Sequence, residues 1–494
     1  MKPGGHFRIT LAFALLVFSM PCVPAQDAKK REVSNPGKEP TVQIEQLRGE
    51  VEQLRAIVEE QRQVILEIKK QTDDGETKRR EISATASSSP ARAQLSNLSA
   101  STAPPAGSKP ASQDKPAVVA GWDSGHAFLR STDGNFETNI TGYVQFDGRG
   151  YQEGNHPANT FLVRRARLAA EGKLFRYFDY KVQADLADTN GTLLRDAYVN
   201  VHRIDALQFR FGHFKEPFSQ EELRSSSNLD FVERSLANNL APSRSPGLMV
   251  SGVINKGTFE YQAGLFNGKG LQALNTTSTP EGVLRLRATP WKASSSIWLR
   301  GLSFGGAVAR GRSQGGLSIR GQSESRSFTF FTPEPVAGKI TRANGEVSWL
   351  AGPASFRAEY DQTSQGRENL GPGGTNLPGV VGKAYMAQFT YLITGEYKTD
   401  TTINPRRNLF GDGRGDAGFG AWELKARYSN LQISDSTARS NRADSFYFGT
   451  NWYLNRFVRH VVDFGIERFK DPPRSPRPGD RNYFVVMSRI QVAF

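Results

Sequence analysis

Apolar and polar residues alternate one by one through much of the chain between residues 121 and 494. In the segment 422–429, for example, Trp, Leu, Ala and Tyr alternate with Glu, Lys, Arg and Ser, and the segments 284–289 and 446–453 alternate in the same way. A period of two is typical of a β-strand, because successive side chains point to opposite faces of a sheet. Turn-forming Gly, Pro, Asn and Asp separate these segments, as in 369–379. The pattern predicts an all-β domain whose strands have one apolar and one charged face.

Two architectures fit such strands. In a soluble sandwich the apolar faces would form a dry core, whereas in a membrane barrel they would meet lipid and the polar faces would line a lumen. The end of the chain favours the barrel. Phe494, Val492 and Ile490 share one strand face, and a last strand that ends in Phe resembles the signal by which bacterial outer-membrane barrels are recognised for insertion. We therefore predict a transmembrane antiparallel β-barrel over residues 121–494.

Residues 1–25 resemble a secretory signal peptide. Lys2 and Arg8 supply the positive charge, residues 9–20 form a short apolar core, and residues 23–25 are small enough for a cleavage site. The apolar core is too short to span a membrane. The single cysteine of the chain lies in this segment, so the mature protein is expected to have none. We predict export to the envelope of a Gram-negative-type bacterium, with the barrel in the outer membrane.

The segment between signal and barrel follows other patterns. A polar stretch, 26–41, precedes a heptad pattern over 42–70, which predicts a coiled coil. A lone solvated helix or a helix packed on the main domain are the alternatives, and the seam does not decide the number of strands. Residues 71–120 are rich in Ser, Ala and Pro and bury too little apolar surface to fold, which predicts a flexible linker. The a and d positions hold Ile44, Leu47, Val51, Leu54, Val58, Gln61, Ile65 and Ile68.

Composition excludes several classes of protein. The chain has 494 residues, 37% of them hydrophobic, and a mean hydropathy of −0.50, which excludes a bundle of membrane-spanning helices. One Cys excludes a disulfide scaffold, and the six His never stand at the spacing of metal ligands, so neither a metal nor another cofactor is expected. No local Ser/His/Asp motif indicates an enzyme. A nucleic-acid partner is not expected either, because an exported barrel offers no recognition helix or aromatic platform.

Charge points to the barrel lumen as an anion pathway. Of the 63 Lys and Arg residues and the 49 acidic residues, 46 and 35 fall in 121–494, which leaves this domain a net charge of +11. Arg285, Arg287 and Arg427 stand at polar phases of their strands. Because Arg on the lipid face would cost about 2–4 kcal/mol near the membrane midplane, these side chains should face the lumen. Rings of basic residues in a pore favour anions. The alternative is that basic residues occupy loops and meet lipopolysaccharide phosphates.

Several segments, in the right order, resemble the phosphate-selective porin family (porins O and P). The first are FLVRRARLAAEGKLFRYFDYKVQADL (161–186), LLRDAYVNV (193–201) and LQFRFGHFKEPFSQEELRSSSNLDFVERSL (207–236). LITGEYK, GFGAWELKARYSNL and GTNWYLNRFVR follow later in the chain. The resemblance covers most of 121–494 and does not include 26–120. It implies a 16-stranded, homotrimeric barrel whose third long loop, here roughly His213–Arg244, folds inward to narrow the channel.

The resemblance also implies site residues. Members line the narrowest part of the channel with basic residues, matched here in VRRAR and FVERSL, and place two serines of the inward loop near the anion, matched in RSSS. The loop's own chemistry adds the two cations that flank Pro217. Adjacent strand residues point oppositely, so Arg164 and Arg165 both face the lumen only if their strand is bulged. The predicted anion pathway comprises Arg164, Arg165, Lys215, Arg224, Ser225, Ser226, Arg234, Arg285, Arg287 and Arg427.

Three positions depart from the family's phosphate-selective members. Those members carry lysines at the positions aligned with Glu222 and Ser227, and an arginine at the position aligned with Tyr143. A glutamate in the constriction would repel a phosphate dianion. We therefore expect weaker phosphate binding than in the specialised members, with the natural anion left open.

The leading hypothesis is a porin that forms a passive, anion-preferring diffusion channel for phosphate or similar small anions. The alternative is a structural barrel that links the outer membrane to the cell wall through the coiled coil. A hydrolase barrel is a weaker third reading. The expected partners are outer-membrane lipid and lipopolysaccharide, small anions, two further copies in a trimer, and peptidoglycan through the coiled coil. The coiled coil is expected in the periplasm as a three-stranded assembly that follows the trimer.

Overall fold

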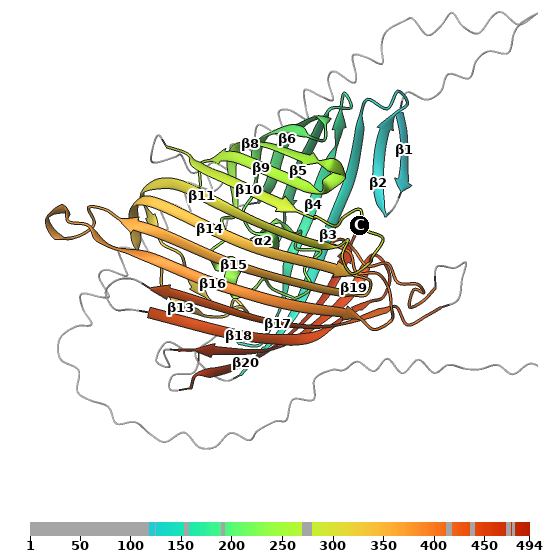
Figure 1. The fold of residues 1–494 in the computed structure, drawn as a ribbon. Helices are drawn as coiled ribbons and strands as arrows, with labels where there is room; N and C mark the ends of the chain where they lie inside the picture. The colour runs from blue at the N-terminus through green and yellow to red at the C-terminus, as the bar shows by residue number, and fades with distance from the viewer. Residues whose placement is uncertain are drawn as a thin grey trace, which may run out of the picture. The chain divides into compact units, whose positions relative to one another are not determined.

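The computed structural model describes the part of the chain that carries the alternating pattern (Figure 1). The signal peptide, the coiled coil and nearly all of the linker lie outside the described residues. Residues 118–494 are described except for 124, 153–157, 189–192, 269–278, 412–416, 435–439, 471–475 and 477–479.

Nearly all described residues with regular structure lie in β-strands. The barrel strands are β3 (Glu137–Tyr151), β4 (Thr160–Leu174), β5 (Phe178–Asp185), β6 (Leu194–Ile204), β7 (Leu207–Lys215), β8 (Arg244–Ile254), β9 (Phe259–Phe266), β10 (Glu281–Ala288), β11 (Leu302–Leu317), β14 (Pro335–Ala351), β15 (Ala354–Arg367), β16 (Leu377–Leu392), β17 (Ala421–Ser434), β18 (Ser440–Tyr453), β19 (Val458–Phe469) and β20 (Asn482–Ala493). The remaining elements are β1 (Val118–Asp123), β2 (His126–Ser131), β12 (Gly321–Gln322), β13 (Thr329–Phe331), the helix α2 (Gln220–Leu223) and the 3-10 turns Leu236–Asn239, Asn255–Gly257 and Pro372–Gly374.

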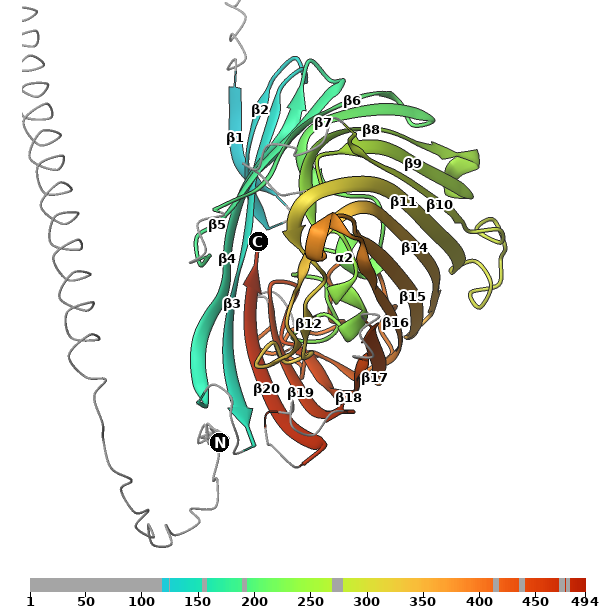
Figure 2. The same cartoon turned by 90° about the vertical axis from the view of Figure 1, so that its left-hand side faces the viewer.

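The sixteen barrel strands pair antiparallel with their neighbours in chain order, and β20 closes the ring on β3. The closing register runs from Tyr143 opposite Ala493 to Tyr151 opposite Val485. Figure 2 shows this ring of strands around α2 and β12. The predicted all-β, 16-stranded antiparallel barrel is confirmed. Within the described residues, no helix combines the length and hydrophobicity that a membrane span needs.

The alternation of side chains matches the sequence pattern. On β17, Leu424 and Tyr428 point outward and are 49% and 36% exposed, whereas Lys425 and Arg427 point into the lumen and are 4% and 3% exposed. The apolar face therefore lies outside, and the charged face lies inside. This is the reverse of a soluble barrel and the arrangement that a lipid surround requires.

All six tryptophans lie at one end of the barrel, the rim at which the C-terminus also lies. Two pairs stack, Trp298 on Trp349 with ring centroids 5.9 Å apart and Trp422 on Trp452 at 5.1 Å. Tryptophan prefers the membrane–water interface because its ring is apolar and its N–H is polar. We call this end the Trp rim, and its stacked pairs mark one membrane boundary.

The hairpin of β1 and β2 extends the sheet at the Trp rim. β2 pairs with the first residues of β3, Glu137–Ile140, beyond the point where β20 ends. Figures 1 and 2 show the hairpin beside β3.

Three connections fold into the lumen. We name residues 216–243, between β7 and β8, the constriction loop; residues 318–334, between β11 and β14, the second inner loop; and residues 393–411, which follow β16 at the Trp rim, the rim loop. Side chains of the two inner loops form the largest apolar cluster, and they pack against β16–β20. The loops therefore fill one half of the barrel. The cluster includes Phe231, Val232, Leu236, Leu240, Phe330 and Phe331 from the loops and Met386, Leu431, Tyr447 and Met487 from the wall.

Candidate functional site

Local hydrogen bonds shape the start of the constriction loop. The Ser219 hydroxyl caps α2 (Gln220–Leu223) by accepting from the backbone N–H of Glu222 at 3.1 Å. At the other end of this turn, the Lys215 ammonium donates to the carbonyl oxygens of Glu222 and, at 2.8 Å, of Arg224. A cation is favourable there because the carbonyl groups at the end of a helical turn lack partners. The residues flanking Pro217 therefore fold the loop on itself before it crosses the lumen.

Asp230 fixes the middle of the constriction loop to the wall and to the rim loop. Its carboxylate is buried and accepts from Arg224 at 2.9 Å, Arg357 at 3.3 Å and Lys398 at 2.7 Å, and also from the Gln388 amide at 2.7 Å. Burial alone would raise the pKa of Asp230, but Arg224, Lys398 and Arg357 outweigh burial and hold the pKa well below its usual range. The loop is thus anchored by a charge shared among three cations.

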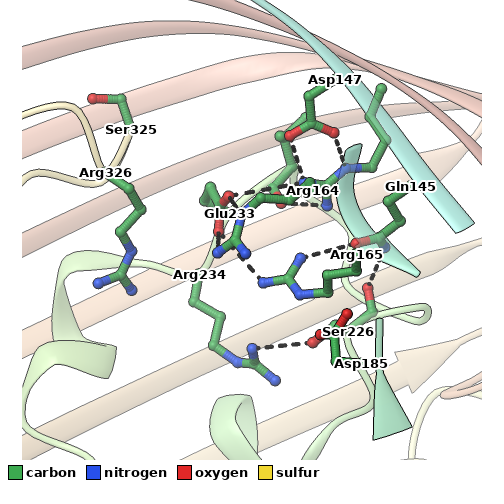
Figure 3. Close-up of polar contacts among 12 residues, drawn as sticks. Gln145, Asp147, Arg164, Arg165, Asp185, Ser226, Glu233, Arg234, Ser325 and Arg326 are labelled. Atoms are coloured by element: carbon green, nitrogen blue, oxygen red, sulfur yellow. Dashed lines mark hydrogen bonds and ion pairs between the residues drawn. The ribbon is translucent and has the colours of Figure 1, made fainter. Parts of the chain in front are cut away.

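Glu233 forms the second anchor (Figure 3). Its carboxylate meets Arg149 at 2.5 Å, Arg164 at 2.6 Å, Arg165 at 3.7 Å and Arg489 at 3.8 Å. Burial favours the neutral acid, yet the four guanidinium groups lower the pKa of Glu233 well below its usual range. The carboxylate therefore stays ionised and balances part of the positive charge of these four arginines.

A β-bulge explains how two adjacent arginines reach one carboxylate. In the pairing of β3 with β4, Gln145 lies opposite Arg165 and Phe146 lies opposite Val163, so that Arg164 has no partner in the register. The extra residue turns both guanidinium groups toward Glu233. The strand is therefore bulged, and Arg164 and Arg165 both face the lumen.

The structure gives every predicted arginine of the pathway a carboxylate within 4.0 Å. Arg285 and Arg287 lie on β10, away from the Glu233 cluster, and pair with Glu346 and Glu260. Ser225 is exposed to the lumen, whereas Ser226 is buried and accepts from Arg234 at 3.3 Å. The remaining pairs are Arg164 and Arg165 with Glu233, Arg224 with Asp230, Arg234 with Glu222, and Arg427 with Glu221 and Glu324.

Two of the three positions that depart from the family pattern contact arginines in the lumen. Glu222 is buried and pairs with Arg234 at 3.2 Å. Burial would raise its pKa, but Arg234 and Lys215 lower it, so the residue is a partner for loop cations. Tyr143 is buried, and its ring lies 5.7 Å from the guanidinium carbon of Arg167.

Two adjoining cavities lie on the side of the lumen opposite the apolar cluster. A cavity of about 200 Å³, which we call the chamber, lies between the constriction loop and strands β4–β9. A second cavity of about 290 Å³ lies toward the Trp rim, where Phe494 and Thr402 line it. Lys181, Gln183 and Ser225 line both cavities, so the two adjoin at the exposed loop serine. The lining of the chamber has one acidic residue, Asp196, and five basic residues, Arg167, Lys181, Arg210, Lys215 and Arg244.

Four of these five basic residues were not among the predicted site residues. The signal for one of them was present, because Gln208 and Arg210 alternate with Leu207, Phe209 and Phe211 in a segment of the family resemblance. The alternation along the strand predicts that such a residue faces the lumen, but it does not show whether an acid neutralises the residue. Among the described residues, no group of three or more His, Cys, Asp or Glu side chains is arranged to hold a metal ion.

Comparison with known proteins identifies the family. A family model described as phosphate-selective porin O and P matches residues 136–494. The chain belongs to this family. Porin O of Pseudomonas aeruginosa is 22% identical over 412 residues, which is 74% of this chain and 90% of that protein.

Solved structures give weaker likenesses. The outer membrane protein OmpT of Vibrio cholerae has a TM-score of 0.49 at 12% identity and covers 73% of this chain and 98% of its own. The outer membrane channel DcaP of Acinetobacter baumannii has a TM-score of 0.48 at 11% identity, covering 74% and 99%. An anion-selective porin from Comamonas acidovorans has a TM-score of 0.44 at 11% identity, covering 72% and 99%.

Family membership and the barrel fold make this chain an outer-membrane porin that forms a channel. Porin barrels have their long loops outside the cell and their short turns in the periplasm. The Trp rim is therefore the periplasmic rim, because short connections, such as 175–177, 205–206, 352–353 and 454–457, lie there. The constriction loop and the second inner loop enter from the outside, and the rim loop enters from the periplasm.

Replacing the anchor carboxylate tests its structural role. Asp230→Asn removes the charge that Arg224, Arg357 and Lys398 share, and breaking a buried pair on one side costs about 3–5 kcal/mol. We expect a clearly lower midpoint of thermal unfolding in detergent and a noisier open-channel current. The control Glu368→Gln removes an exposed pair with Arg312, where about 0–1 kcal/mol is expected. Equal midpoints for the two variants would show that the loop does not depend on Asp230.

The anchors also predict how the channel responds to acid. Folding lowers the pKa of Asp230 and Glu233, so their stabilisation is complete above the ordinary values of 3.8 and 4.5 and is lost as the pH falls toward the lower folded values. We expect the difference in unfolding midpoint between the unmodified protein and Asp230→Asn to stay constant from neutral pH to about pH 5 and to shrink only in stronger acid. A difference that already shrinks between pH 7 and pH 5 would contradict this assignment.

Proposed function

We propose that this porin is a passive, anion-preferring diffusion channel for phosphate or similar small anions. One observation carries the proposal: the lining of the chamber has five basic residues and one acidic residue. An excess of fixed positive charge in a narrow lumen raises the local concentration of anions and excludes cations. The family description, phosphate-selective porin O and P, supports the same sign of selectivity.

The ion pairs of the constriction loop support weak binding during transit. A phosphate that approaches Arg164 competes with Glu233, which already lies 2.6 Å from that guanidinium. Glu222 and Ser227 stand where the specialised family members carry lysines. Selectivity would then arise mainly in the chamber, where the basic residues outnumber the acidic ones. Weak binding favours a high rate of conduction, because an anion that binds weakly is also released quickly.

The reversal potential of the open channel tests this function. With a potassium chloride gradient across a planar bilayer at neutral pH, we expect a potential of the sign that chloride dictates. Phosphate should block the chloride current only at concentrations well above the micromolar range. A cation-preferring potential, or a folded barrel that does not conduct, would contradict the proposal. The second result would favour the envelope-tethering alternative.

For the extension we propose a three-stranded coiled coil in the periplasm over residues 42–70, joined to each barrel by the linker 71–120. Three tethered copies have a high local concentration, so the coiled coil would follow the symmetry of a barrel trimer. The heptad pattern carries this proposal. Contact with peptidoglycan would make the same segment an envelope tether.

Deleting residues 26–120 separates the two parts of the protein. We expect a folded barrel with unchanged single-channel conductance, and a trimer that dissociates at a lower temperature on gels run without boiling. Loss of conductance in the purified, folded deletion variant would show that the extension is part of the pore. It would also show that the boundary at residue 121 is wrong.

A further inference from the structure

The chamber contains one guanidinium that no acidic group of the described residues neutralises. The chamber's other arginines pair with acids, Arg167 with Asp185 and Arg244 with Asp196, both at 2.8 Å. Arg210 has no acidic partner within 4.0 Å in the part of the chain that the structure describes, and its Nε is buried without a hydrogen-bond partner.

The two lysines of the chamber are also occupied. Lys181 pairs with Glu171 at 2.6 Å, and the Lys215 ammonium donates to two backbone carbonyl oxygens of the constriction loop. Among the basic groups of the chamber, Arg210 is therefore the one most available to a guest. An arginine offers a carboxylate a planar fork of two parallel N–H donors.

Aromatic rings fix this guanidinium in place. The guanidinium carbon of Arg210 lies 4.4 Å from the centre of the Tyr198 ring and 5.5 Å from that of Phe214. The two rings meet edge to face at 6.0 Å. Contact with the rings orients the cation without neutralising it, because the ring carries no net charge. A preorganised donor loses little entropy when an anion binds.

The rest of the chamber wall is partly apolar. Pro217 and Leu223 of the constriction loop and Met249 and Phe214 of the wall line the same cavity as Arg210. Inorganic phosphate gains nothing from these groups, because all of its oxygens need polar partners. A singly charged carboxylate with an apolar body satisfies both surfaces.

We propose that the chamber binds small carboxylates with an aromatic or branched apolar body, with the carboxylate on the Arg210 guanidinium and the body against Pro217, Leu223 and Met249. This inference rests on the proposed function and narrows its substrate class. The chamber volume of about 200 Å³ limits the guest to a small molecule. Phosphate would pass the same route with less retention.

Block of the chloride current by three anions tests the inference in the full-length protein. Benzoate, acetate and inorganic phosphate are added separately to open channels in a planar bilayer at pH 7. We expect benzoate to reach half-block at a concentration about tenfold lower than acetate, because its ring buries apolar surface that acetate lacks. We also expect benzoate to block more tightly than phosphate. Phosphate block as tight as benzoate block would overturn the proposal.

Substitutions locate the site. Arg210→Gln should raise the half-blocking concentration of benzoate about tenfold, to the acetate level, because the charged fork is lost. Arg210→Lys keeps the charge and supports folding, yet it should weaken benzoate block severalfold, because an ammonium cannot pair in bidentate fashion. The control Arg312→Gln removes an arginine of the outer surface that pairs with Glu368 at 2.6 Å, and it should leave block unchanged.

The outcomes separate this inference from the function on which it rests. Unchanged benzoate block in both Arg210 variants, in channels that conduct chloride normally, would overturn the carboxylate site and leave an anion-preferring porin. A cation-preferring reversal potential in the unmodified protein would overturn the proposed function as well. Benzoate block that falls in Arg210→Gln and Arg210→Lys, but not in Arg312→Gln, would support the site.

Discussion

The constriction loop is held inside the barrel because two of its carboxylates, Asp230 and Glu233, each meet several cations. A sixteen-stranded barrel is too wide for wall side chains alone to fill. The loop adds the missing volume, and Asp230 and Glu233 fix its position against Arg357, Lys398 and Arg489. If the loop left the lumen, the buried cations of the wall would lose their carboxylate partners. A charge buried without a partner is costly, so the docked arrangement is the one of lowest energy.

This docking determines where the open space lies. The apolar side chains next to the anchors, among them Phe231 and Leu236, pack against β16–β20, so the loop fills that half of the lumen. The chamber remains on the opposite side, against β4–β9. Lys398 extends the same network to the rim loop by pairing with both Asp230 and Glu423. The periplasmic connection and the extracellular loop therefore support each other through one buried carboxylate.

The sequence predicts the fold well because the relevant signal is local. A period of two predicts a strand and the face that it turns to the lumen, as β17 shows. The Glu233 cluster is not local: Arg164 and Glu233 are 69 residues apart, and Arg149 and Glu233 are 84 apart. Arg427 and Arg210 both stand at polar positions of an alternating segment, so the sequence pattern does not distinguish them. Only Arg427 has carboxylate partners in the described structure.

The net charge of the domain is a poor guide to the charge that a passing solute meets. The +11 excess is spread over strands, loops and surface, whereas the arginines at the constriction lie next to carboxylates that offset their charge locally. A paired arginine still contributes, because the Arg164 side chain is 31% exposed and can meet an anion that competes briefly with Glu233. Under the proposed function, such competition would shorten the stay of the anion without reversing the preference for its sign. Paired arginines would therefore favour fast passage, whereas Arg210, which has no carboxylate partner in the described structure, would favour retention. The positions of the carboxylates, more than the number of arginines, would therefore determine where in the lumen an anion passes quickly and where it is retained.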